Sequence, residues 1–109
     1  MTEFQELINK IIAFRDARDW EQFHNSKDLA IAINLEASEL LELFLWKGNE
    51  DISKDKLKEE LADVFMYAIL LAEKHKIDIK EIITAKIELN NKKYPVEKSK
   101  GSSKKYNEL

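Results

Sequence analysis

Residues 61–72 read LADVFMYAILLA, and this stretch decides the fold. Its only charged residue is Asp63, and its pattern indicates part of a helix that begins near Asp55 and ends in residues 73–76. A helix that is apolar on almost every face has to be buried on all sides. A single chain of this size can hardly bury it completely, so the stretch predicts an all-α protein whose helical bundle is completed by oligomerisation.

The composition excludes several other classes of protein. The chain has 109 residues, with two glycines, one proline and no cysteine. A β-sandwich or barrel needs a turn signal about every 8–12 residues, so multi-stranded β folds are disfavoured. Without cysteine there is no disulfide framework, thiolate metal site or cysteine nucleophile. The N-terminal MTEFQELINK lacks the apolar segment of a signal peptide, and the apolar run is shorter than the roughly 20 residues of a membrane span, so we expect a cytoplasmic protein without membrane contact.

Three further helices are predicted from apolar spacing, over residues 2–17, 25–48 and 78–93. Each begins at a residue whose side chain can cap a helix, namely Thr2, Asn25 or Ser26, and Asp78. Gly48 is expected to stop the second helix, and Tyr94–Pro95 the fourth. The four helices form one predicted domain over residues 1–95.

A basic, irregular C-terminal tail is predicted over residues 96–109. The net charge of the chain is -3, but residues 86–109 carry seven lysines against three glutamates. A lysine-rich end is usually solvated, and the pattern does not resemble the footprint of a protein that binds duplex DNA. We therefore expect no nucleic-acid polymer as a partner.

Two acidic pairs stand out on the central helices. Glu36 and Glu39 are three residues apart, as are Glu60 and Asp63, so each pair projects from one face of its helix. The surrounding helix segments contain no lysine or arginine. An isolated buried carboxylate is unfavourable by several kilocalories per mole unless it is paired, protonated or bound to a metal. Oxygen ligands without histidine or cysteine suit Mg²⁺, with Mn²⁺ as a second possibility, and they predict phosphoryl chemistry.

Other interpretations of these acids stay open. Glu-x-x-Glu is common on solvated helix faces, and Glu42 and Glu59 fit that description. A di-iron site needs Glu-x-x-His on two helices, and only residues 21–24 match, in a connector rather than on an inward-facing stripe. The placement of two acidic pairs in apolar surroundings favours the metal and phosphate interpretation over both.

Several segments, taken together, resemble the all-α MazG-type nucleoside triphosphate pyrophosphohydrolases, and within them the short dCTP pyrophosphatase group. The resemblance runs from about residue 10 to the C-terminus and implies a four-helix MazG-like bundle. The segments that carry it, besides the acidic pairs, are DWEQFH (19–24), ELFLWK (42–47), EELADVFMY (59–67), KYP (93–95) and KGSSKKY (100–106).

The resemblance also implies roles for particular residues. The residues implied to hold Mg²⁺ and to carry catalysis are Glu36, Glu39, Glu60 and Asp63. The residues implied to surround the base and sugar are Trp20, His24, Trp46 and Tyr67. The residues implied to reach the phosphates or a neighbouring active site are Lys86, Asn90 and Tyr94. Lys93 stands where relatives often carry arginine, which weakens bidentate phosphate binding there. The chain lacks the second MazG repeat of longer relatives, and the family assembles as dimers of dimers.

The expected function is Mg²⁺-dependent hydrolysis of a (deoxy)nucleoside triphosphate to the monophosphate and pyrophosphate, with dCTP or a modified pyrimidine triphosphate as substrate, in cleansing the nucleotide pool. Two alternatives remain at this point. One is a relative that acts on dUTP or phosphoribosyl-ATP, and the other is a non-catalytic helical adaptor whose acidic face binds a basic partner. The base preference, the number of metal ions, the general base and the order of the tail stay open.

Overall fold

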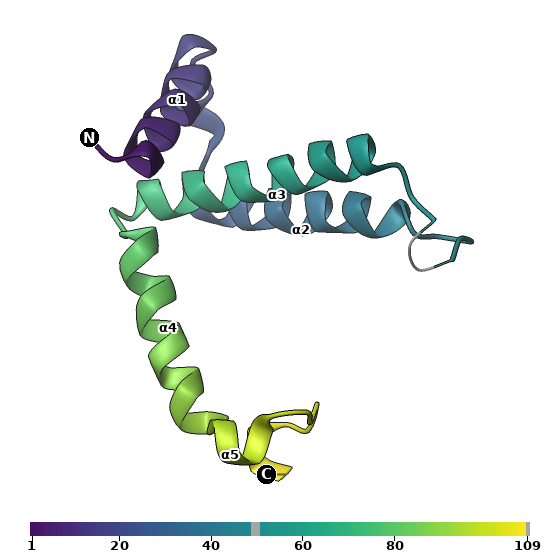
Figure 1. The fold of residues 1–109 in the computed structure, drawn as a ribbon. Helices are drawn as coiled ribbons and strands as arrows, with labels where there is room; N and C mark the ends of the chain where they lie inside the picture. Colours follow the sequence, from purple (N-terminus) through teal and green to yellow (C-terminus); the bar gives the residue numbers. More distant parts are fainter. Residues whose placement is uncertain (49–50, 109) are drawn as a thin grey trace. The chain divides into compact units, whose positions relative to one another are not determined.

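A computed structural model describes residues 1–48 and 51–108, and every secondary-structure element within them is helical (Figure 1). The all-α prediction is confirmed. The elements are α1 (Glu3–Ala17), the 3₁₀ turn η1 (Glu21–Phe23), α2 (Ser26–Glu42), α3 (Lys54–Lys74), α4 (Ile79–Lys93), the short α5 (Val96–Ser99) and the 3₁₀ turn η2 (Tyr106–Glu108). None of the described helices is both long and apolar enough to span a membrane.

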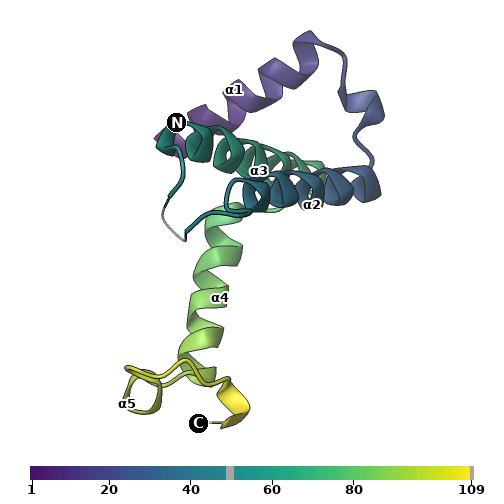
Figure 2. The ribbon, with the colours of Figure 1, turned by 90° about the vertical axis from the view of Figure 1, so that its right-hand side faces the viewer.

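The chain forms two compact units, which divide between Lys76 and Ile77. In the first unit α2 and α3 run side by side as an antiparallel pair, and α1 packs against α3 (Figures 1 and 2). The second unit contains α4, α5 and η2. The core of the first unit is small: Leu29 is 1% exposed, and it is joined by Ile8, Ile11, Ile69, Leu70 and Ala72.

Side-chain caps begin the helices where the sequence predicts them. The Thr2 hydroxyl accepts a hydrogen bond from the Gln5 amide at 3.1 Å, and the Asp78 carboxylate accepts one from the Glu81 amide at 3.0 Å. For the second helix Asn25 is the cap, and the helix begins at Ser26. Each cap satisfies a backbone amide that has no partner within its helix, so these starts are encoded locally.

The end of α2 differs from the prediction. The helix ends at Glu42 rather than at Lys47–Gly48, and the chain continues in turns in which amides bond to carbonyls three residues back, such as Phe44 to Leu41 at 3.0 Å. Trp46, with φ 63°, adopts the left-handed conformation that the prediction gave to glycine. Tightening of the last turn therefore replaces the expected glycine stop.

The predicted irregular tail contains two short helical elements. Pro95 precedes α5, and its carbonyl accepts hydrogen bonds from the amides of Lys98 and Ser99 at 3.0 and 2.9 Å. A proline is well placed before a helix because its fixed φ suits the first turn. The connector at residues 49–50 and the last residue of the tail lie outside the described residues.

Large apolar side chains stay exposed on the single chain. On α3, Phe65 is 62% exposed, and α2 and α4 carry similar residues, namely Leu35, Leu41, Ile82, Ile83 and Ile87. Burial of such side chains is the main favourable contribution to folding and association. The exposure agrees with the expectation that one chain alone cannot bury its apolar helix faces.

The Asn25 cap provides a test of this account of helix α2. Its side chain accepts a hydrogen bond from the Asp28 amide and donates one to the Asp28 carboxylate, both at 2.8 Å. Asn25→Ala should lower the free energy of unfolding by about 1 kcal/mol, measured by urea denaturation. Ser38→Ala, inside the same helix, is the control and should change it by less than about 0.5 kcal/mol. Equal effects of the two variants would contradict the assigned cap.

Candidate metal centre

The antiparallel pair of α2 and α3 brings the acidic pairs together. Glu36, Glu60 and Asp63 each place one carboxylate oxygen within 4.8 Å of the others, and all three side chains are half-buried. Glu39 is exposed, one turn further along α2, and its charge acts on both Glu36 and Glu60. Three of the four predicted acids therefore converge, and Glu39 lies beside them; the four residues are referred to below as the carboxylate cluster (Glu36, Glu39, Glu60 and Asp63).

The cluster concentrates negative charge in a partly desolvated place. Burial, followed by the neighbouring Glu39, Asp63 and Glu60, raises the pKa of Glu36 from 4.5 to about 7. Burial and the same kind of repulsion also raise the pKa of Glu60. Both effects disfavour the ionised forms, so a cation at this position would be strongly stabilised.

Two oxygens of the cluster have no partner in the protein. Glu36 Oε2 and Glu60 Oε2 are buried and make no hydrogen bond. The ion pairs of Arg15 are with Asp16 and Glu21, which lie outside the cluster. Unsatisfied carboxylate oxygens that converge within one small space are the ligands that Mg²⁺ and Mn²⁺ prefer, so the residues present fit a hard divalent cation.

An aromatic cavity of about 300 Å³ adjoins the cluster at Asp63. It contains Trp20, His24 and Tyr67, three of the residues predicted to surround a nucleobase, together with Phe14, Arg15, Met66 and Leu70. The rings of His24 and Tyr67 meet edge to face with centroids 6.3 Å apart. Aromatic walls of this kind can stack on a planar ligand.

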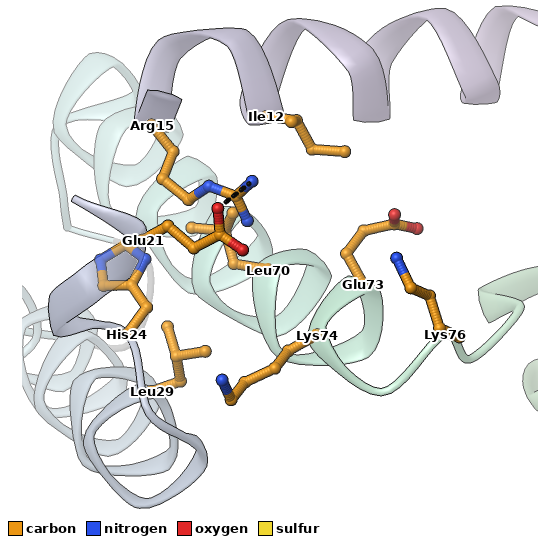
Figure 3. Close-up of a pocket in the computed structure, with 9 residues that line it drawn as sticks. All are labelled: Ile12, Arg15, Glu21, His24, Leu29, Leu70, Glu73, Lys74 and Lys76. Atoms are coloured by element: carbon orange, nitrogen blue, oxygen red, sulfur yellow. Dashed lines mark ion pairs between the residues drawn. The ribbon is translucent and has the colours of Figure 1, made fainter. Parts of the chain in front are cut away.

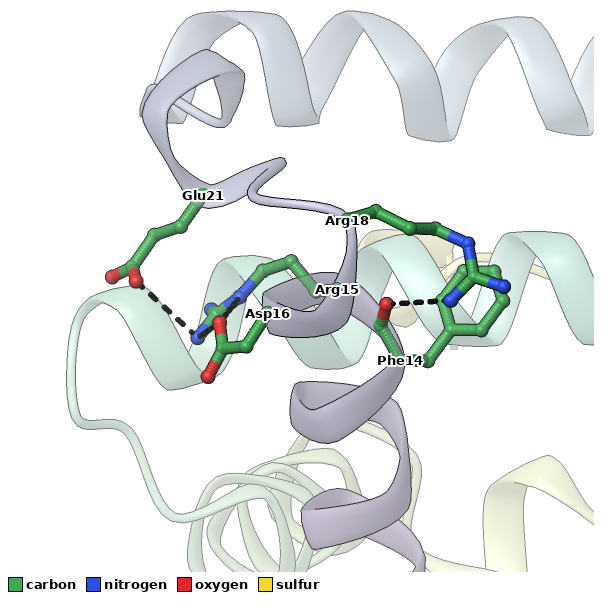
Figure 4. A network of polar contacts seen from close by, with 5 residues as sticks. All are labelled: Phe14, Arg15, Asp16, Arg18 and Glu21. Carbon is green, nitrogen blue, oxygen red and sulfur yellow. Dashed lines mark hydrogen bonds and ion pairs between the residues drawn. The ribbon is translucent and has the colours of Figure 1, made fainter.

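Arg15 is a residue of this cavity that sequence reasoning missed. Its side chain is 11% exposed, and its guanidinium contacts Asp16 at 2.8 Å and Glu21 at 3.6 Å (Figure 4). The neighbouring Arg18 lies over the Phe14 ring at 3.8 Å and donates a hydrogen bond to the Phe14 carbonyl. The available signal was position: Arg15 follows Ile11 by four residues and so continues the apolar stripe of α1.

A further cavity, of about 370 Å³, lies where α1, η1 and the C-terminal end of α3 meet (Figure 3). Arg15 and His24 line both this cavity and the aromatic one. Burial, and then the positive charge of Arg15, lowers the pKa of His24, and its Nδ1 is buried without a hydrogen-bond partner. Both effects favour the neutral form of His24, which lies at the boundary of the two cavities.

The other predicted substrate residues lie elsewhere. Trp46 is fully exposed on the turn after α2 and does not line the aromatic cavity. Lys86 and Asn90 are four residues apart on one face of α4, and the Tyr94 amide donates to the Asn90 carbonyl at 2.7 Å. These three residues belong to the second unit, which is described by itself.

The fold and the site define an all-α protein with a candidate divalent-metal centre formed by carboxylates of two antiparallel helices. Residues 31–109 match the MazG-like family, and the chain belongs to that family. The resemblance inferred from the acidic pairs and the aromatic segments is thereby confirmed.

Individual relatives give more specific similarities than the family match. The chain is 38% identical over 104 residues to dCTP pyrophosphatase 1 from Bos taurus and from Homo sapiens, which covers 88% of this chain and 62% and 61% of those proteins. It thus spans about three fifths of the length of these curated relatives. The structure is similar to that of a pyrophosphatase from Archaeoglobus fulgidus, with a TM-score of 0.81 and 35% identity over 87% of this chain and 94% of that one.

Proposed function

We propose that this protein is a Mg²⁺-dependent nucleoside triphosphate pyrophosphohydrolase, which converts dCTP or a modified pyrimidine triphosphate to the monophosphate and pyrophosphate and so cleanses the nucleotide pool in the cytoplasm. The observation that carries the proposal is the convergence of Glu36, Glu60 and Asp63, with two buried unpartnered oxygens, beside an aromatic cavity. The names of the relatives, dCTP pyrophosphatase 1, support the reaction and the choice of base.

In this proposal the carboxylate cluster holds Mg²⁺, or Mn²⁺ in its place. The bound cation would offset negative charge on the triphosphate oxygens. A water molecule attacks the α-phosphorus, the bond between that phosphorus and the bridging oxygen to the β-phosphorus breaks, and one carboxylate of the cluster accepts the proton of the water. The side chains of α2 and α3 thus position both the substrate and the proton acceptor, since they come from two helices that are packed together.

The aromatic cavity holds the base in this proposal. Trp20, His24 and Tyr67 surround a space that adjoins Asp63, so a base placed there has its α-phosphate next to the cluster. Stacking contributes roughly 1–3 kcal/mol per base and tolerates several bases, so the preference for cytosine rests on the relatives. Lys86, Asn90 and Tyr94 remain proposed phosphate contacts, and Trp46 a proposed base contact.

We propose further that the protein works as a homo-oligomer, a dimer or a dimer of dimers. The exposed apolar residues of α2, α3 and α4, Phe65 foremost, support this because a second copy would remove them from water. Association would complete the four-helix bundle, and it offers the exposed Trp46 a place in the site of a neighbouring copy.

A product analysis tests the proposed reaction. The protein is incubated with each common dNTP, and with phosphoribosyl-ATP, in the presence of Mg²⁺, and the products are separated by ion-exchange chromatography. We expect dCTP to give dCMP and pyrophosphate, and excess EDTA to stop the reaction. Preferred turnover of dUTP or phosphoribosyl-ATP would reassign the substrate, release of inorganic phosphate would contradict the bond cleaved, and folded but inert protein would favour an acidic-faced adaptor.

A further inference from the structure

A cavity of about 560 Å³ adjoins the carboxylate cluster at the end away from the aromatic cavity. It lies between the end of α2 and the first turns of α3, and Glu39 and Glu60 belong both to its wall and to the cluster. Along α3 the order is therefore this cavity at residues 53–60, the cluster at residues 60–63 and the aromatic cavity at residues 63–70. We refer to it as the lysine cavity, because Lys47 and Lys56 line it.

Lys47 and Lys56 are the positively charged residues in the wall of this cavity, whereas its other charged residues are glutamates. Lys47 follows α2 in the turn, and Lys56 lies in the first turn of α3, so the two come from different segments to one cavity. Neither forms an ion pair with an acid among the described residues, although Glu39, Glu42 and Glu60 also line the cavity. An ammonium group offers three hydrogen-bond donors and no acceptor, and it is a common partner of phosphate.

We infer that the lysine cavity is the subsite for the pyrophosphate leaving group, with Lys47 and Lys56 binding the β- and γ-phosphoryl groups. The inference rests on the proposed function and adds a direction to it. With the base in the aromatic cavity and the α-phosphorus at the cluster, the next position along α3 is the lysine cavity. The β- and γ-phosphoryl groups would therefore lie in the lysine cavity.

In this inference the two lysines stabilise the negative charge that develops on the leaving group during bond cleavage. When the bond from the α-phosphorus to the bridging oxygen breaks, its electron pair stays on pyrophosphate, and the proton of the attacking water goes to a carboxylate of the cluster. The ammonium groups of Lys47 and Lys56, both exposed on the wall of the cavity, are placed to donate hydrogen bonds to the added negative charge on pyrophosphate. Glu60 would help to hold a cation next to this cavity, and Lys47 and Lys56 would supply ammonium donors from its wall.

Titration calorimetry with inorganic pyrophosphate and Mg²⁺ tests the subsite directly. Lys47→Gln and Lys56→Gln should each weaken pyrophosphate binding about tenfold, the loss expected for one charge-assisted hydrogen bond. Lys58→Gln is the matched control, because the substitution removes the same charge from the same helix as Lys56→Gln. Lys58 is exposed and does not line the cavity. Binding of dCMP, which occupies the aromatic cavity and the cluster, should stay within about twofold in all three variants.

The outcomes separate this inference from the proposed function. Pyrophosphate affinity that is equal in the wild type and both cavity variants, an equal loss in Lys58→Gln, or no binding by the wild type would each overturn the subsite. Hydrolysis of dCTP together with lysine-independent pyrophosphate binding would keep the function and reject the subsite. Lysine-dependent binding in a protein that hydrolyses no triphosphate would keep the subsite and reject the function.

Discussion

Glu60→Gln should lower the turnover of the preferred triphosphate by at least about a hundredfold while the protein stays folded. A metal ion in such a site contributes several kilocalories per mole to the transition state, and each 1.36 kcal/mol is about a factor of ten in rate. Glu60 contributes one of the three converging oxygens, and its Oε2 is buried without a partner. Glutamine has the same shape but removes the charge that the cation needs.

Glu59→Gln is the control for this prediction. Glu59 is the preceding residue, is exposed and carries the same charge, but it lies outside the cluster. Steady-state turnover at saturating Mg²⁺, together with thermal melting of each variant, separates the alternatives. If Glu59→Gln lost as much activity as Glu60→Gln, or if Glu60→Gln kept its turnover, the cluster would not be the catalytic centre. Loss of folding in Glu60→Gln would indicate a structural carboxylate instead.

The second large effect concerns the stability of the metal-free protein. Burial and the neighbouring carboxylates raise the pKa of Glu36 to about 7, whereas the unfolded chain has the ordinary value near 4.5. Between these two values the folded state holds a proton that the unfolded state has released, so the free energy of unfolding falls as the pH rises. The contribution is fully present below pH 4.5 and is lost as the pH passes 7.

Glu36→Gln should remove this pH dependence. In EDTA at pH 8 the variant should melt about 5 °C higher than the wild type, which corresponds to about 1 kcal/mol in a domain of this size. At pH 4.5 the difference should be small, because Glu36 is then protonated in the folded wild type and about half protonated in the unfolded chain. Added Mg²⁺ should raise the melting temperature of the wild type and not that of the variant.

Glu42→Gln provides the comparison for the melting experiment. Glu42 is exposed at the end of the same helix and lies outside the converging set of three. The prediction fails if Glu42→Gln stabilises the metal-free protein as much as Glu36→Gln does, since the effect would then reflect general charge reduction. It also fails if the wild type grows more stable between pH 5 and pH 8.

Much of the secondary structure and of the acidic site can be predicted from short-range sequence patterns. The starts of the helices at Thr2, Asn25 and Asp78 depend on one side chain and one amide three residues away, so the sequence predicts them correctly. The acidic pairs have the same local character, because a spacing of three places two side chains on one helix face. Family membership follows from these pairs together with the aromatic segments.

Other features could not be predicted because they depend on residues far apart in the chain. Arg15 enters the aromatic cavity only because α1 packs against α3, and its pairing with Glu21 requires the turn at η1. The end of α2 at Glu42 was missed for a different, local reason: it depends on the hydrogen-bonded turn through residues 43–46 rather than on the glycine that the pattern suggested. Trp46 therefore lies exposed and outside the aromatic cavity.

By itself, the sequence determined the helical class, the helix starts and the four acids, since each of these is set by neighbours within one or two turns. Only the tertiary structure decided which acids share one metal-sized space, and that an aromatic and a lysine-lined cavity flank them on opposite ends. The reason is physical: cavities and shared charge arise where two helices pack, and the register of that packing depends on side chains more than 20 residues apart, such as Glu36 and Glu60.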